Sequence, residues 1–97
     1  MGFQDLHLDL AVEVVSTNDL FTEVARKAEE YLRAGVRRLW VVEPTLRVVY
    51  VYRPDGTISI LRETHELDGE DVLPGFRCRV VELFPWLQGI GRIVPEA

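Results

Sequence analysis

Asp9-Leu-Ala-Val-Glu13-Val-Val-Ser16 places two carboxylates inside an otherwise apolar run. Apolar and polar side chains alternate over residues 4–15, and a period of two over this length is typical of a β-strand. The apolar face carries Leu6, Leu8, Leu10, Val12 and Val14. The sequence therefore predicts a strand whose opposite face carries both Asp9 and Glu13.

A helix is predicted directly after this strand. Residues 16–19 are Ser, Thr, Asn and Asp, all of which are common helix caps. Apolar side chains then recur with helical spacing, at Phe21, Val24, Ala25, Ala28, Tyr31 and Leu32. Gly35 is suited to end the helix, because glycine readily takes the left-handed conformation found there.

The rest of the chain predicts strands. Residues 39–42 form a short apolar run, which indicates a strand buried on both faces. Residues 47–53 and 57–62 flank the turn sequence Pro54-Asp-Gly56 and predict a hairpin. We expect a short strand at 76–80 to close the sheet and one helical turn at 81–84. The fold class is therefore α+β, a mixed and mainly antiparallel sheet with one main helix packed on it.

Length and composition narrow the class of protein. A chain of 97 residues forms one small domain, which we place at residues 1–84, followed by an apolar C-terminal tail at 85–97. The net charge of −5 argues against a broad basic surface for nucleic acid, but it is compatible with acids that hold a metal. Cys78 is the single cysteine, and no apolar stretch reaches membrane-spanning length. We expect a cytoplasmic protein.

Asp9 and Glu13 are the first candidates for chemistry. Four residues along a strand separate their Cα atoms by roughly 13 Å. Two carboxylates at that separation do not readily share one Mg²⁺ at ~2.1 Å. A metal at Glu13 therefore needs another carboxylate from a neighbouring strand, and Asp9 is either an assisting group or the solvated end of the strand. The alternative is a solvated face, but a carboxylate in so apolar a run requires a partner.

Lys27 is the second candidate. In the predicted helix it lies at the border of the apolar stripe. Its ammonium can extend into solvent, pair with Glu23 or Glu30, or reach across to Glu13. In the last case it could position a water molecule or stabilise the charge that develops on a phosphate.

Several segments together resemble the Uma-two family of restriction-endonuclease-like proteins, within the PD-(D/E)xK nuclease superfamily. They are the strand Asp9–Ser16 and the runs Lys27-Ala-Glu-Glu-Tyr31, Ala34-Gly-Val36, Trp40-Val-Val-Glu-Pro44, Val51-Tyr-Arg-Pro-Asp-Gly56 and Leu73-Pro-Gly-Phe76. The resemblance implies a Mg²⁺- or Mn²⁺-dependent DNA endonuclease. It implies that Glu13 is the metal-binding acid and Lys27 the catalytic lysine. Asp9 corresponds to the aspartate of a Pro-Asp-Leu segment, although Leu8 replaces the proline.

The resemblance covers only the C-terminal half of the family's fold. Full-length members have an earlier region that supplies a further metal-binding aspartate, and this chain lacks it, so we expect an N-terminally truncated nuclease domain. The alternative is a non-catalytic, homo-oligomeric or partner-binding remnant of the fold. The exposed sheet edge left by the missing region predicts a homodimer or higher homo-oligomer.

Overall fold

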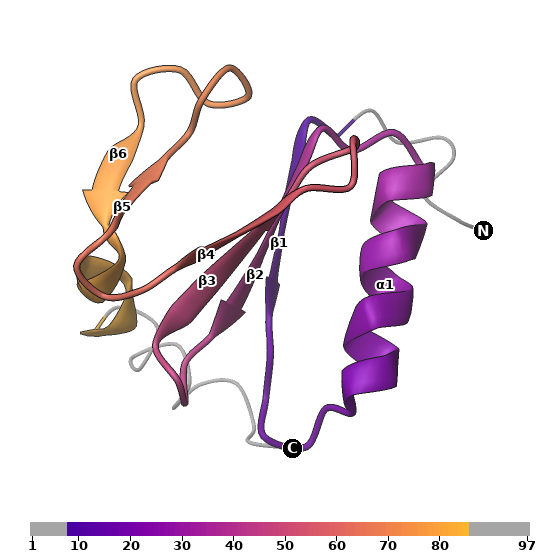
Figure 1. Cartoon of the computed structure of the whole chain (residues 1–97), viewed down its shortest axis with the longest axis horizontal. Coiled ribbons are helices and arrows are strands. Elements are labelled where there is room, and N and C mark those ends of the chain that lie inside the picture. Colours follow the sequence, from indigo (N-terminus) through magenta and orange to yellow (C-terminus); the bar gives the residue numbers. More distant parts are fainter. Residues whose placement is uncertain (1–7, 86–97) are drawn as a thin grey trace.

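The structure is a computed structural model that describes residues 8–85. Its main sheet has the strand order β1-β2-β3-β4, formed by β1 (Leu10–Val14), β2 (Arg38–Glu43), β3 (Val48–Tyr52) and β4 (Ile58–Leu61). β1 and β2 are parallel and joined through helix α1 (Phe21–Arg33), whereas β2, β3 and β4 pair antiparallel. This mixed sheet with one main helix confirms the predicted α+β class (Figure 1).

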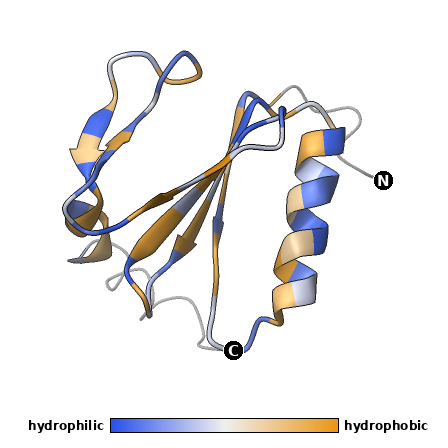
Figure 2. Cartoon of the chain, in the orientation of Figure 1, coloured by the Kyte–Doolittle hydropathy of each residue, from blue (hydrophilic) through white to orange (hydrophobic). Residues whose placement is uncertain are grey.

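Helix α1 packs on one face of the main sheet. The buried residues between them are Ala11, Ala28, Val36, Leu39 and Val41. Ala11 of β1 and Ala28 of α1 both contribute small side chains to this core. Figure 2 shows the strands of this sheet as mostly hydrophobic, while the outer side of α1 is hydrophilic. The helix is therefore amphipathic, as its apolar spacing predicted.

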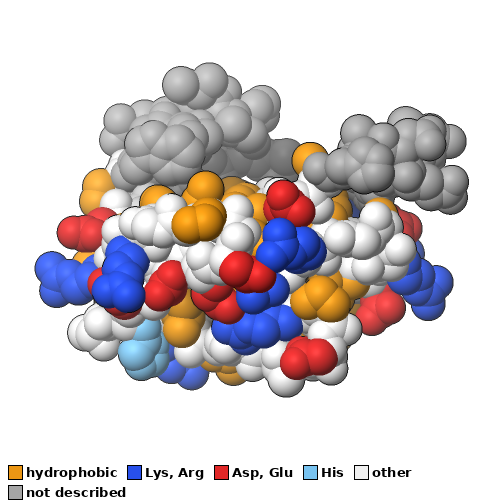
Figure 3. All heavy atoms as spheres, turned by 90° about the horizontal axis from the view of Figure 1, so that it is seen from above, with side chains coloured by type: hydrophobic (Ala, Val, Ile, Leu, Met, Phe, Trp, Pro, Cys, Tyr) orange, Lys and Arg blue, Asp and Glu red, His pale blue; other side chains and the backbone are white. Residues whose placement is uncertain are grey.

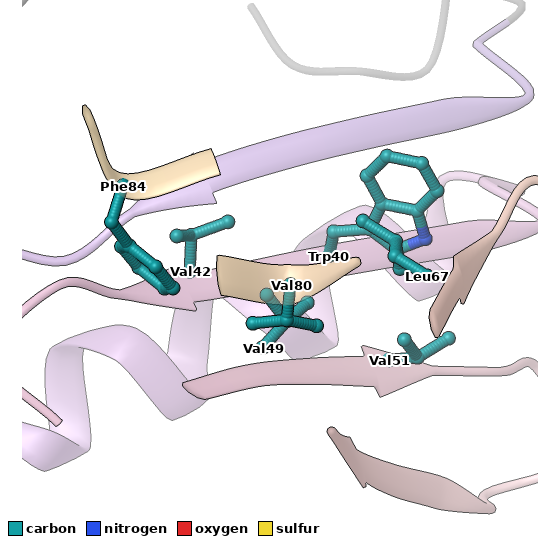
Figure 4. Packing of buried hydrophobic residues seen from close by; sticks show 7 residues of the cluster. All are labelled: Trp40, Val42, Val49, Val51, Leu67, Val80 and Phe84. Atoms are coloured by element: carbon teal, nitrogen blue, oxygen red, sulfur yellow. The ribbon is translucent and has the colours of Figure 1, made fainter. Parts of the chain in front are cut away.

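The opposite face of the sheet is covered by the last described elements. These are β5 (Glu66–Asp68), β6 (Arg77–Arg79) and the short 3₁₀ helix η2 (Val80–Glu82). The core on this side contains Trp40, Val42, Val49, Val51, Leu67, Val80 and Phe84 (Figure 4). Because β2 contributes to both cores, residues 39–42 are buried on both faces, which confirms the prediction from their apolar run.

The prediction that residues 76–80 close the main sheet was wrong. β6 pairs with β5 in a separate two-stranded sheet, and β5 was not predicted at all. A turn at the end of β4 redirects the chain, because the backbone N–H of Arg62 donates to Nδ1 of His65 and the His65 N–H donates to the Arg62 carbonyl. The hairpin thereby leaves the sheet and lays Leu67 and Val80 on its face.

The start of the helix also differs from the prediction. None of the four residues at 16–19 caps α1; the N-cap is Leu20, whose N–H donates to the Glu23 carboxylate at 3.3 Å. Asp19 instead accepts a bond from the Ser16 N–H, which closes the turn before the helix. Gly35 follows the helix with a φ of +99°, as expected for its left-handed end.

The first strand is shorter than its alternating pattern. β1 begins at Leu10, residues 4–7 of the predicted strand lie outside the described residues, and most of the predicted tail, residues 86–97, does too. Among residues 8–85, α1 is too short and too polar to cross a bilayer, and no other helix qualifies.

Candidate active site

Glu13 and Lys27 meet between β1 and α1. Glu13 lies near the end of β1 on the face that α1 covers, and its side chain is 21% exposed. Nζ of Lys27 donates to Oε2 of Glu13 across 3.2 Å. Of the alternatives open for Lys27, the structure therefore selects the contact with Glu13. The carboxylate that lacked a partner in its apolar run obtains one from the following helix.

Local structure accounts for this contact. A parallel β1–β2 pair requires the intervening helix to run back along the sheet, so its early turns pass the end of β1. The turn at 16–19 is held by the Asp19 N–H bonding to the Ser16 carbonyl and the Asn18 N–H bonding to Ser16 Oγ. It places Lys27 beside Glu13 although the two are fourteen positions apart.

The ion pair sets the charge of the lysine. The hydrogen bond that Lys27 donates to Glu13, followed by the negative charge of Glu13, raises the pKa of Lys27 above the ordinary 10.5, although partial burial acts in the opposite direction. Lys27 is therefore fully protonated at neutral pH. A fixed ammonium at this point suits the stabilisation of negative charge rather than proton abstraction.

A shallow cavity of about 150 Å³ opens beside the pair. It is lined by Glu13, Asp19, Glu23, Val24, Arg26 and Lys27. Neither Asp19 nor Glu23 was a candidate for chemistry from the sequence, because acidic residues at these positions are typical of a helix start. Both carboxylates bond backbone N–H groups of the turn and helix start. Glu13, by contrast, bonds the Lys27 side chain and not a backbone N–H group of the turn or helix start.

Asp9 lies away from this cavity. It precedes β1, its side chain is 64% exposed, and its carboxylate pairs with Arg37 at 3.4 Å. Arg37 also pairs with Asp71. The structure thus brings Glu13 and Lys27 together and does not bring Asp9 to them. A metal-binding role for Asp9 stays a prediction, and within residues 8–85 no group of three or more His, Cys, Asp or Glu side chains is arranged to hold an ion.

A second polar cluster joins the β5–β6 hairpin to the main sheet. Arg38 and Arg53 each donate to one oxygen of Glu70 at 2.9 Å, and Arg38 also contacts Asp71 at 3.0 Å. Arg53 further donates to Ser59 on β4 at 2.8 Å. A cavity of about 290 Å³ lies beside Arg53 and Glu70. Because these charges satisfy one another, we assign the cluster a structural role.

Sequence comparison identifies the family. Residues 2–81 match the sequence profile of the Uma2 family, which is described as "Putative restriction endonuclease". The chain belongs to this family. The match covers most of the chain and confirms the resemblance drawn from its motifs.

Structural comparison supports the same fold. The chain is similar to the crystal structure of a "putative nuclease" belonging to DUF820 from Anabaena variabilis, with a TM-score of 0.73 and 22% identity. The likeness covers 81% of this chain and 45% of that one, so this chain spans less than half of that nuclease's length. No curated protein matches the chain.

Proposed function

We propose that this chain is a Mg²⁺- or Mn²⁺-dependent endonuclease that acts on DNA through Glu13 and Lys27. The observation that carries the proposal is the 3.2 Å contact between these two side chains. One oxygen of Glu13 is engaged by Lys27, which leaves the carboxylate a second oxygen for a cation. Membership of the Uma2 family supports a nuclease rather than another use of such a pair.

The residues fit a magnesium-type ion in chemistry and in exposure. Mg²⁺ takes oxygen ligands and commonly keeps several waters alongside one or two carboxylates. Glu13 is a partly exposed carboxylate at a cavity, so it can bind such an ion without full dehydration. When bound, the metal supplies Lewis-acid activation of a phosphodiester and of water.

The protein's own contribution is positioning and charge. Glu13 would hold the metal in a fixed place, because β1 is held in register with β2 and cannot shift without moving the core. Lys27 holds a permanent positive charge beside that point and can stabilise the charge that builds on a phosphate in the transition state. Val24 gives the same cavity an apolar wall.

DNA binding must come from few contacts. Figure 3 shows acidic and basic side chains interleaved over the visible face, with no wide basic patch among the described residues of that face. With a net charge of −5, the chain cannot rely on many phosphate contacts. We therefore expect weak binding without metal, and strongly metal-dependent binding to a phosphodiester.

Substitution of Lys27 tests this function. Lys27→Met keeps the aliphatic stem and removes the charge, and we expect the rate of plasmid nicking with Mn²⁺ to fall about 10²–10³-fold. Arg33→Met is the matched control, because Arg33 lies on the same helix in an exposed ion pair with Glu29. The control should nick at the wild-type rate. Equal rates for both variants, or an inactive wild-type protein, would refute the proposed role.

A second function is favoured by one observation. Residues 8–85 bring a single candidate metal carboxylate, Glu13, to Lys27, which is the minimum of the one or two carboxylates that usually hold Mg²⁺. A partner-binding remnant of the nuclease fold would show so small a set of carboxylates. Such a protein would associate and remain folded, yet would not nick DNA with any divalent metal.

A further inference from the structure

The outer edge of β1 is open in the described part of the chain. β1 is the terminal strand of the main sheet and pairs only with β2. The Arg38 N–H donates to the Asp9 carbonyl and the Val15 N–H donates to the Val42 carbonyl. The odd-numbered residues of this segment thus direct their backbone groups toward β2. By the alternation of a strand, Leu10, Val12 and Val14 direct theirs outward.

Nothing in β1 blocks pairing along this edge. Natural edge strands are usually protected by Pro, Lys, a bulge or very short length. β1 has five residues without Pro, Gly or Lys, and Glu13, its only charge, is already bound by Lys27. Val12 and Val14 are 50% and 46% exposed on the face opposite α1. The edge therefore offers both unpaired backbone groups and apolar side chains.

The backbone groups of Leu10, Val12 and Val14 that point away from β2 can pair with the same groups of a second copy. In an antiparallel pair, a residue whose backbone N–H and C=O point toward the other strand must lie opposite another such residue. A two-fold axis at Val12 meets this condition over the whole strand. Val12 then faces Val12, and Leu10 faces Val14. We propose that two copies of this chain pair antiparallel through β1 and that the pair builds one divalent-cation site from its two Glu13 carboxylates. This proposal rests on the proposed function, and in it the second metal-binding carboxylate is the Glu13 side chain of the other copy.

This register brings the Glu13 residues of the two chains close to each other. With Val12 on the axis, Glu13 lies opposite Ala11, and the two Glu13 residues become diagonal neighbours about 7–8 Å apart. The small Ala11 side chain leaves room between them. Two glutamates at that separation can reach one shared ion, and one or two carboxylates with several waters is the set that Mg²⁺ prefers.

The helices do not obstruct this pairing. Among the strands, α1 makes its closest approach to β2, where Leu39 and Val41 share a core with Ala28 of the helix. The helix therefore lies over the interior of the sheet and not beyond β1. Lys27 stands on the side of the helix nearest the edge, where it meets Glu13. In the pair, two Lys27 ammonium groups would therefore flank the two carboxylates and offset their repulsion.

The first test measures mass by sedimentation over a concentration series. We expect a dimer of about 22 kDa, twice the 11.1 kDa of one chain. Val12→Lys places two like charges opposite each other on the axis and should give a monomer. Ile58→Lys is the control, because Ile58 is also 50% exposed and lies in β4, the other edge strand. A wild-type monomer, or a dimer broken by Ile58→Lys and not by Val12→Lys, would overturn the proposal.

The second test measures Mn²⁺ binding by calorimetry, without DNA. We expect one ion per two chains for the wild type and a loss of affinity of about tenfold or more in the Val12→Lys monomer. Glu13→Gln should remain a dimer and lose the ion. One ion per chain, or equal affinity in the monomer, would overturn the shared site.

These measurements separate the two proposals. A dimer that binds one Mn²⁺ through Glu13 yet never nicks DNA would leave this inference intact and refute the nuclease. Nicking by a monomeric protein would leave the nuclease intact and refute the shared site.

Discussion

At the scale of single residues, Glu13 holds the charge of Lys27. Glu13 lies in an apolar run of β1, and the ammonium of Lys27 is the partner it contacts. The raised pKa of Lys27 means that this pair stabilises the fold fully below the lysine's ordinary pKa of 10.5. The contribution is lost only as pH rises through the higher value in the folded protein. The pair is therefore intact throughout the neutral range.

The pKa of Lys27 can be measured directly by NMR titration of its Nζ. We expect a value above 10.5 in the wild-type protein, because Glu13 favours the charged form. In Glu13→Gln the pKa should fall back toward the ordinary value. An unchanged pKa in this variant would show that the two side chains are not in contact in solution.

The sequence predicted part of the arrangement at the candidate site, and the chemical roles of its residues stay predictions. The family resemblance singled out Glu13 and Lys27, and strand geometry argued that Asp9 is too distant to share an ion with Glu13. The structure agrees in pairing Asp9 with Arg37 instead. That partner could not be predicted, because it is twenty-eight positions away and depends on where β2 begins.

At the scale of elements, charged side chains attach the β5–β6 hairpin to the sheet. Burial alone would raise the pKa of Glu70, but the hydrogen bonds from Arg53 and Arg38 outweigh it and hold the pKa below the ordinary 4.5. A carboxyl group whose pKa is lowered in the folded protein contributes its full stabilisation at pH values above its pKa in the unfolded chain. That stability is lost as pH falls through the lower value in the folded state.

Acid unfolding tests the role of Glu70. Glu70→Gln should lower the free energy of unfolding at neutral pH by about 1–2 kcal/mol, the range for charged hydrogen bonds at a partly exposed site. The deficit relative to wild type should shrink as pH falls below 4.5. Glu63→Gln is the control, because it removes an exposed pair with Arg47. A deficit that is independent of pH would contradict this role.

Sequence patterns predicted the longer strands but neither the short strand β5 nor the start of α1. Strands with several alternating or apolar residues, such as β2 and β3, were predicted because burial imposes the pattern. β5 has three residues and one buried side chain, Leu67, which is too little for periodicity to register. Capping at residues 16–19 failed as a prediction because Ser and Asp stabilise turns through the same bonds that they make at helix starts.

At the scale of the whole molecule, two apolar cores on opposite faces of one sheet hold the fold together. The core away from α1 includes Phe84, which is 2% exposed and lies beneath the guanidinium of Arg47 at 5.6 Å from its ring centroid. It packs with Val49 and Val80, both fully buried. This core fixes the end of the described chain against the sheet.

Replacing Phe84 tests that core. Phe84→Ala should lower the free energy of unfolding in urea by about 3–5 kcal/mol, the usual range for a buried phenylalanine. Phe21→Ala provides the control, since Phe21 is 83% exposed and should change stability by less than about 0.5 kcal/mol. Similar losses for the two variants would mean that Phe84 is not buried in solution.

We propose that Glu13 makes this protein a metal-dependent nuclease. The most direct measurement is nicking of supercoiled plasmid with Mn²⁺, beside Glu13→Gln and the exposed control Glu29→Gln. We predict that the wild type and Glu29→Gln nick at the same rate, that chelation of the metal stops both, and that Glu13→Gln is inactive. Nicking by Glu13→Gln at the wild-type rate, or none by the wild type, would contradict the claim.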